Sequence, residues 1–280
     1  MISRFLKVIG LGCVVAASLP FGAKASDFFT GSVDGIDLGA AGDTYHWAIF
    51  SLGGNVSISD ITYNPSFADV LGNIGQAGKS TVSVVKGRVQ GDVWVHTGGS
   101  VGVSGGAITG SILQGSTYDT VLNHGVSDAT SASLFANSLA ATPGSLSTIH
   151  LSNSSLSISA GSIANYVMHI TDFVLSSSTL TLSGTASQHF IIDVTGNFSL
   201  SGASQVLLSG GLTPQDVLFN IVGSSPSSIG LSGGSSLKGI VLAPNRMVTL
   251  SGGSSDLGEV IAQKITLSGS SQVHNPLVSP

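Results

Sequence analysis

The chain has 280 residues, of which 42% are hydrophobic and only 8% charged, with 38 glycines and a formal net charge of −5 at pH 7. A chain this apolar is not disordered, and its negative charge argues against nucleic acid or an anionic membrane as a partner. So few charged side chains cannot cover an ordinary helical surface. Short runs of Val, Ile, Leu and Thr between Ser and Gly are instead typical of strands and turns.

Residues 1–25 have the pattern of a secretory signal peptide. Arg4 and Lys7 precede an apolar run that is too short to span a membrane, and Ala23-Lys-Ala25 supplies the small residues of a cleavage site. The single cysteine, Cys13, lies within this segment, so the mature chain is expected to have no disulfide. We therefore expect a secreted protein, extracellular or at the cell surface, with six basic and fourteen acidic residues, a net charge of 6 − 14 = −8.

The mature chain is expected to form a single domain over 45–276, with an N-terminal cap over 26–44 and a tail over 277–280. Strand-like alternation begins at residue 45, and an irregular stretch follows over 61–79. Alternation resumes over 81–113, where it is regular enough to predict two turns of a repeating β structure.

One segment, residues 127–142, breaks the strand pattern and is predicted to be helical. Ser127 or Asp128 can cap its start, it contains no interior glycine, and Pro143-Gly144 ends it. Its apolar side consists of Ala132, Phe135 and Leu139. A lone amphipathic helix must lay this side on another element. We expect it to cover outward-facing apolar side chains of the strands, namely Ile240, Leu242 and Ile261.

The second half of the chain contains a repeat. The segments 239–251 and 258–268 are near copies whose leading glycines lie 19 residues apart, and Leu-Ser-Gly recurs at Leu182, Leu200, Leu208, Leu231, Leu250 and Leu267. A unit of this length cannot bury an apolar face alone and must stack on copies of itself. The predicted fold is therefore all-β, a right-handed parallel β-solenoid (β-helix) with one α-helix packed along its flank.

The order of these segments resembles a known family. Tyr45 to Ser59, Lys86 to Gly91, Gly239 to Gly253 and Val260 to Pro276 look like the choice-of-anchor A domain of bacterial surface proteins, a family also described as collagen-binding-like. The layout of strands, then a helix, then strands is also similar to the ice-binding β-solenoid family. The first resemblance implies an exported adhesion or structural module, although the chain shows no anchoring motif before Pro280. The second implies ice binding.

The candidate ligand face comes from alternation within the repeats. In each Thr/Ser-Leu-Ser triplet the leucine is predicted to point inward, so its two neighbours share the outer face. Stacked in successive turns, these neighbours would form two columns of small hydroxyl groups that suit an extended repetitive partner such as a matrix protein, a glycan or ice. Such residues also occur on any exposed solenoid strand, so a purely structural role is the alternative. The predicted face comprises Thr181, Ser183, Ser199, Ser201, Ser232, Thr249, Ser251, Thr266 and Ser268.

Catalysis finds little support in the sequence. Polysaccharide cleavage needs clustered carboxylates, whereas the chain has a single glutamate, Glu259, and only Asp193 and Asp216 are candidates for a converging pair. The seven histidines show no metal-ligand spacing, and Asp34, Asp37 and Asp43 match no calcium loop. The sequence therefore predicts no catalytic residues, metal or cofactor. Its leading interpretation is a non-catalytic adhesion or structural module, and its alternative is an ice-binding protein with a flat Thr/Ser face.

Overall fold

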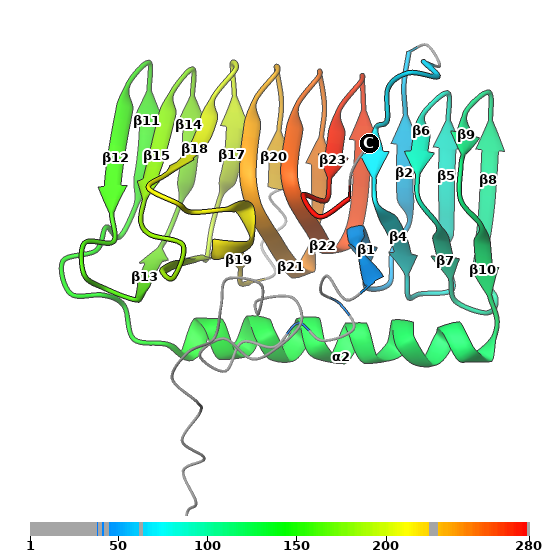
Figure 1. The fold of residues 1–280 in the computed structure, drawn as a ribbon, viewed down its shortest axis with the longest axis horizontal. Helices are drawn as coiled ribbons and strands as arrows, with labels where there is room; N and C mark the ends of the chain where they lie inside the picture. Colours follow the sequence, from blue (N-terminus) through cyan, green and yellow to red (C-terminus); the bar gives the residue numbers. More distant parts are fainter. Residues whose placement is uncertain (1–37, 39–40, 42–44, 62–63, 224–228, 279–280) are drawn as a thin grey trace, which may run out of the picture.

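The computed structural model describes residues 38, 41, 45–61, 64–223 and 229–278. The predicted signal peptide and almost all of the predicted N-terminal cap lie outside the described residues, as does the end of the predicted tail. The described chain winds into a parallel β-solenoid, in which each winding adds one strand to each of three parallel sheets (Figure 1).

The first sheet, which we call the covered sheet, lies against the single long helix. It contains β13 (Asn165–Ile170), β16 (His189–Val194), β19 (Val217–Ile221), the middle of β21 (Ser236–Leu250) and of β22 (Ser255–Ser268), β1 (Trp47–Ser51), β4 (Asn73–Gln76), β7 (Val93–Val95) and β10 (Ile112–Gln114).

The second sheet, the hydroxyl sheet, follows the covered sheet along each winding. It contains β11 (Ile149–Ser152), β14 (Phe173–Ser176), β17 (Phe198–Ser201), β20 (Ile229–Leu231), the C-terminal ends of β21 and β22, β2 (Val56–Ser59), β5 (Thr81–Val85) and β8 (Ser100–Ser104).

The third sheet, the mixed sheet, completes each winding. It contains β12 (Ser155–Ser159), β15 (Thr179–Ser183), β18 (Gln205–Ser209), the N-terminal ends of β21 and β22, β23 (Gln272–His274), β3 (Val70–Leu71), β6 (Arg88–Gln90) and β9 (Ala107–Ile108). A short 3-10 helix, η3 (Pro214–Asp216), leads from β18 into β19. Because β3 and β4 fall within 61–79, the prediction of an irregular stretch there was wrong in part.

The windings do not follow one another in sequence order. The chain enters the solenoid in its interior, because β1 pairs with β4 on one side and with β22 on the other. It winds outward to β10 at one end, crosses to the opposite end, and winds back from β11 until β22 and β23 close on β1, β2 and β3. Two separately wound halves therefore share three continuous sheets.

The helix that makes this crossing, α2 (Ser116–Ser138), begins earlier and ends earlier than the predicted 127–142. Nine strands stack in the hydroxyl sheet of the described chain, so its two ends are about 38 Å apart at about 4.8 Å per strand. A helix of 23 residues extends about 35 Å, which matches that span. The sequence prediction began too late because it required a segment without interior glycine, which leaves out Gly125 and the residues before it. In the structure, however, a Cβ at Gly125 would lie 2.5 Å from the Phe50 ring, so glycine is needed where the helix approaches the sheet closely.

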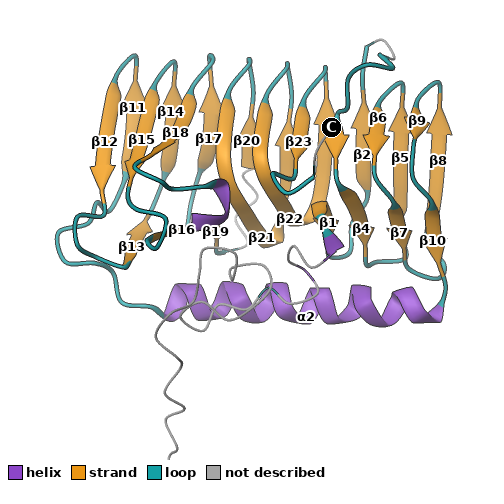
Figure 2. Cartoon of the chain, in the orientation of Figure 1, coloured by secondary structure: helices purple, strands orange, loops and turns teal. Residues whose placement is uncertain are grey.

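The helix covers the surface that the sequence predicted for it. Its buried residues, among them Leu122, Ala129 and Ala132, pack with the outward side chains of the covered sheet. These include Ile240, Leu242 and Ile261, so this prediction is confirmed. Figure 2 shows the helix lying across the strands, along the direction in which the windings stack. Each large apolar side chain buried in this way contributes about 1.5–3 kcal/mol relative to exposure.

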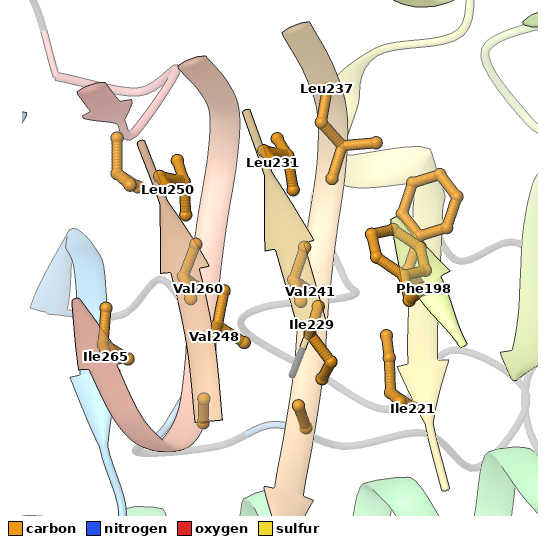
Figure 3. Close-up of a cluster of buried hydrophobic side chains, with 14 of the residues drawn as sticks. Phe198, Ile221, Ile229, Leu231, Leu237, Val241, Val248, Leu250, Val260 and Ile265 are labelled. Carbon is orange, nitrogen blue, oxygen red and sulfur yellow. The ribbon is translucent and has the colours of Figure 1, made fainter. Parts of the chain in front are cut away.

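Inside the solenoid, inward side chains of the three sheets form one continuous apolar core (Figure 3). The leucines of the repeats stack in register, as Leu200 does on Leu231 and Leu250 does on Leu267. Phe173 and Phe198 stack with ring centroids 4.9 Å apart and an interplanar angle of 14°. At one corner, Gly239 pairs with Gly258, and a Cβ at Gly258 would lie 1.9 Å from the Gly239 carbonyl oxygen. This close contact explains the glycine at 258, and the glycine at 239 is needed because a Cβ there would lie 2.8 Å from the Phe219 ring.

The corner between the hydroxyl and mixed sheets uses two successive left-handed residues, and the second is strained where it is not glycine. The second position is Gly234 (φ 74°) and Gly253 (φ 75°) in two windings but Ala203 (φ 60°) and Ser270 (φ 61°) in two others. Left-handed backbone costs a non-glycine residue about 1–2 kcal/mol, and the greater freedom of glycine in the unfolded chain offsets about 0.5–1 kcal/mol of this. We therefore expect Ala203→Gly to raise the free energy of unfolding by about 0.5–1 kcal/mol in urea titration. The exposed Ala186, whose φ is not positive, is the control, and Ala186→Gly is expected to lower stability. A loss of stability in Ala203→Gly would contradict this account of the corner.

Candidate binding face

Two columns of small side chains run along the outer surface of the hydroxyl sheet. Each strand contributes two outward residues that flank an inward Leu, Ile or Val, and parallel pairing sets neighbouring strands about 4.8 Å apart. The central column is His150, Val174, Ser199, Gly230, Thr249, Thr266, Ser57, Ser83 and Gly102. The edge column is Ser152, Ser176, Ser201, Ser232, Ser251, Ser268, Ser59, Val85 and Ser104.

The structure brings together seven of the nine predicted face residues and separates two. Thr181 and Ser183 lie on β15 in the mixed sheet, where Thr181 pairs with Ser157 and Leu207. The prediction was wrong because the 18 residues from Leu182 to Leu200 looked like one winding. The true winding in this sheet runs 25 residues, from Leu175 to Leu200, so Val174 and Ser176 occupy the predicted places.

Sequence reasoning also missed several members of the two columns. Ser57 and Ser59 on β2 pair in register with Thr266 and Ser268, and Ser83 on β5 pairs with Ser57, although no Leu-Ser-Gly triplet marks them. Their only signal was the alternation of Val56-Ser-Ile-Ser59 with its inward apolar residues. The helical crossing places these N-terminal strands beside the C-terminal repeats, and this cannot be read from a local motif.

The middle of this surface is uniformly small, uncharged and half-exposed. From β17 to β2, no side chain in either column is larger than threonine. The hydroxyls of Thr249 and Thr266 make no hydrogen bond to another residue of the described chain, so both are free to meet an external partner. The ends differ, because His150 carries a side chain that is 60% exposed and Val85 adds an exposed apolar group.

The other two sheets offer no comparable surface within the described chain. The covered sheet lies beneath α2. The mixed sheet carries longer outward side chains, among them Gln205, Lys238 and Leu257. The flat array of short side chains is therefore confined to the hydroxyl sheet.

Asp193 and Asp216, the only candidates for a catalytic pair, lie in separate settings. Asp193 on β16 accepts a hydrogen bond from Asn220 and lies 3.4 Å from His169. Asp216 in η3 accepts hydrogen bonds from the Thr213 backbone and hydroxyl. Burial raises the pKa of both carboxyls, and hydrogen bonds oppose the rise. The two carboxylates share no partner among these contacts.

Asp193 belongs to a polar link that fastens α2 to the covered sheet. Asn220 accepts a hydrogen bond from the Ser133 hydroxyl at 2.6 Å and donates to the Ser133 carbonyl at 3.0 Å and to Asp193. All three side chains are buried. The arrangement holds the helix against the covered sheet.

Replacing Asn220 is expected to destabilise the protein. Asn220→Ala leaves the buried Asp193 carboxylate without its donor, at a cost of about 1–3 kcal/mol. Loss of the donor raises the pKa of Asp193 further, so the cost is expected to be larger at pH 7 than below the unfolded value of 3.8, where this carboxyl is protonated in both states. Urea unfolding at the two pH values measures the difference, and an equal cost at both would contradict this role.

Two further properties concern metals and membranes. Among the described residues, no group of three or more His, Cys, Asp or Glu side chains is arranged to hold a metal ion. Asp34, Asp37 and Asp43 fall outside the described residues. No helix in the described part of the chain is long and apolar enough to cross a membrane.

Fold and surface together define a class: a β-solenoid with a helix along its flank that presents a repeating flat face. A family model described as ice-binding-like matches residues 50–273, and the chain belongs to this family. No curated protein matches the chain.

Solved structures of ice-binding proteins share the fold. A glycosylated ice-binding protein from an Arctic yeast aligns with a TM-score of 0.58 at 20% identity over 88% of this chain and 96% of its own. One from the Antarctic ascomycete Antarctomyces psychrotrophicus gives 0.55 at 20% identity over 88% and 98%. One from an Antarctic bacterium of the Flavobacteriaceae gives 0.56 at 20% identity over 85% of this chain and 46% of its own.

These findings bear on the two resemblances and correct the leading interpretation of function. The family match supports the ice-binding resemblance and does not support choice-of-anchor A. The leading interpretation, an adhesion or structural module, was therefore wrong, and the alternative is the better supported of the two. The sequence misled because the solenoid segments quoted for the first resemblance are features of the fold, and folds do not specify ligands.

Proposed function

We propose that the protein binds ice, without catalysis, through the two outer columns of the hydroxyl sheet. Membership of the ice-binding-like family supports the ligand. The observation that carries the choice of surface is the register of Thr249 with Thr266 and of Thr266 with Ser57, which places free hydroxyls on one flat face. The pattern of residues 1–25 supports export, so the mature chain acts outside the cell.

The geometry accounts for binding through repetition and rigidity. Each threonine offers a hydroxyl that can hydrogen-bond to a water and a methyl group that packs against the same layer. Because the strands are hydrogen-bonded on both sides and rest on a close-packed core, the columns lose little conformational freedom on binding. Many weak contacts, each fixed in advance, then add up over the length of the face.

An ice-recrystallisation assay on the chain without residues 1–25 tests the proposal. Frozen solutions are annealed below the melting point, and the growth of ice grains is followed with time. The protein is expected to hold grain size nearly constant at concentrations at which a non-binding protein of equal size has no effect. Grain growth equal to that of this control would refute ice binding.

A further inference from the structure

A row of buried serines runs inside the corner that borders the edge column. Four windings share the same corner, in which an outward serine, two left-handed residues and a buried serine follow one another. The buried serines, together with one at the shorter corner after β14, are between 0% and 4% exposed. This serine row consists of Ser178, Ser204, Ser235, Ser254 and Ser271.

Each hydroxyl of the serine row is tied to the edge column of its own winding. Ser204 donates to the Ser201 carbonyl at 2.6 Å, and Ser254 donates to the Ser251 carbonyl at 2.8 Å. The same bond recurs at Ser178, Ser235 and Ser271, with lengths of 2.7, 2.7 and 2.8 Å. The acceptor is always the backbone of the outward serine whose side chain belongs to the candidate face.

The serine row also connects neighbouring windings. The Ser178 amide donates to the Ser204 hydroxyl at 3.1 Å, and the Ser254 amide donates to the Ser271 hydroxyl at 3.2 Å. Backbone bonds run beside them, from Ala203 to Gly233 at 2.8 Å and from Gly234 to Gly252 at 2.9 Å. If one winding shifted at this corner, its hydrogen bonds to the neighbouring winding would therefore break.

We infer that the serine row is a positioning element for the ice-contacting face. It fixes the backbone beneath the edge column at the same height in each winding, so the hydroxyls above it lie in one plane. This role rests on the proposed function. It assigns an effect on ice affinity to residues that ice cannot touch, because their hydroxyls are buried and already committed inside the protein.

The test compares two double variants of the mature chain. Ser235→Ala with Ser254→Ala removes two members of the serine row, at a cost of about 1–3 kcal/mol each. The control, Ile191→Val with Ile261→Val, weakens the contact between α2 and the covered sheet by about 0.5–1.5 kcal/mol for each change. Both are assayed for ice recrystallisation well below the temperature at which either unfolds, with the folded fraction measured by circular dichroism.

We expect the serine variant to need about tenfold more protein for half-maximal inhibition, which corresponds to about 1.4 kcal/mol, while the control stays close to wild type. An unchanged serine variant, or an equal loss in the control, would overturn the inference. Hydrogen exchange supplies a second measurement, and the Gly253 amide, which bonds to Gly269, is expected to exchange faster only in the serine variant. Wild-type protein without ice activity would refute the proposed function itself, whereas unchanged exchange at Gly253 would refute the positioning role alone.

Discussion

Replacing Thr249 and Thr266 with tyrosine is expected to abolish most of the inhibition of ice recrystallisation while leaving the fold intact. The two threonines are adjacent in the central column, and both are half-exposed with free hydroxyls. Two tyrosine rings would stand above the plane of their neighbours and keep a flat lattice from approaching Ser199 or Ser57. Because the contacts act together, we expect the concentration for half-maximal inhibition to rise by about a hundredfold, or about 2.8 kcal/mol.

The chain provides a matched control for this variant. Thr179 and Thr181 are half-exposed threonines on β15, but they lie on the mixed sheet. Tyrosine at these two positions adds the same bulk to an outward strand surface without touching the hydroxyl sheet. We expect this control to retain wild-type activity. If both variants lost activity equally, or if the Thr249 and Thr266 variant kept it, the hydroxyl sheet would not be the contact surface.

Replacing Asp256 with leucine is expected to stabilise the protein. Asp256 occupies an inward position of the mixed sheet between Leu237 and Val273, is 2% exposed, and has no hydrogen-bond partner for either carboxylate oxygen in the described chain. A buried polar group without a partner costs about 1–3 kcal/mol, and leucine adds the burial of an apolar side chain. We expect a gain of about 2–4 kcal/mol and a rise in Tm of about 5–10 °C. Calorimetry that showed a lower Tm would mean that the larger side chain does not fit there.

The same residue predicts a pH dependence whose sign follows from burial. Burial raises the pKa of Asp256 well above its ordinary value of 3.8. Between that value and the higher folded pKa, the unfolded chain has lost the proton and the folded chain still holds it, so the contribution of Asp256 to stability falls as pH rises. We therefore expect Asp256→Asn, which is neutral at every pH, to gain stability over wild type as pH rises above 3.8.

Urea unfolding of wild type and Asp256→Asn at several pH values measures this effect. The other buried aspartates, including Asp69, Asp193 and Asp216, are present in both proteins, so their titration cancels in the difference. A difference that did not change with pH would contradict a raised pKa at Asp256.

Much of the fold could be predicted from the two repeat copies. Alternation in these copies predicted that Ile240 and Leu242 face outward, and in the structure the residues between and after them, Val241 and Ala243, lie in the core and pair with Val260 and Ala262. The need to cover the two outward residues correctly indicated where a helix would lie. The alternation of the strands and the need to bury outward apolar side chains were therefore enough to predict the architecture around β21 and β22.

The assignment of strands to sheets could not be predicted as well. A Leu-Ser-Gly triplet marks the end of a strand whose leucine points inward. Such triplets occur on both the hydroxyl sheet, as at Leu200, and the mixed sheet, as at Leu182. Windings differ in length, so spacing alone did not show which sheet Thr181 joins. The burial of Asp256 in the core could not be predicted either, because its inward position follows from its register with Leu237 and not from the chemistry of an aspartate.

Partition into slowly growing ice tests the central claim most directly, that this protein binds ice through the hydroxyl sheet. Ice is grown from a dilute solution that contains the mature chain and an inert protein of similar size, and both are measured in the solid and in the liquid. The account predicts that the mature chain is enriched in the ice, that the Thr179 and Thr181 tyrosine variant is enriched equally, and that the Thr249 and Thr266 tyrosine variant stays in the liquid. Exclusion of the wild-type chain to the same extent as the inert protein would contradict the account.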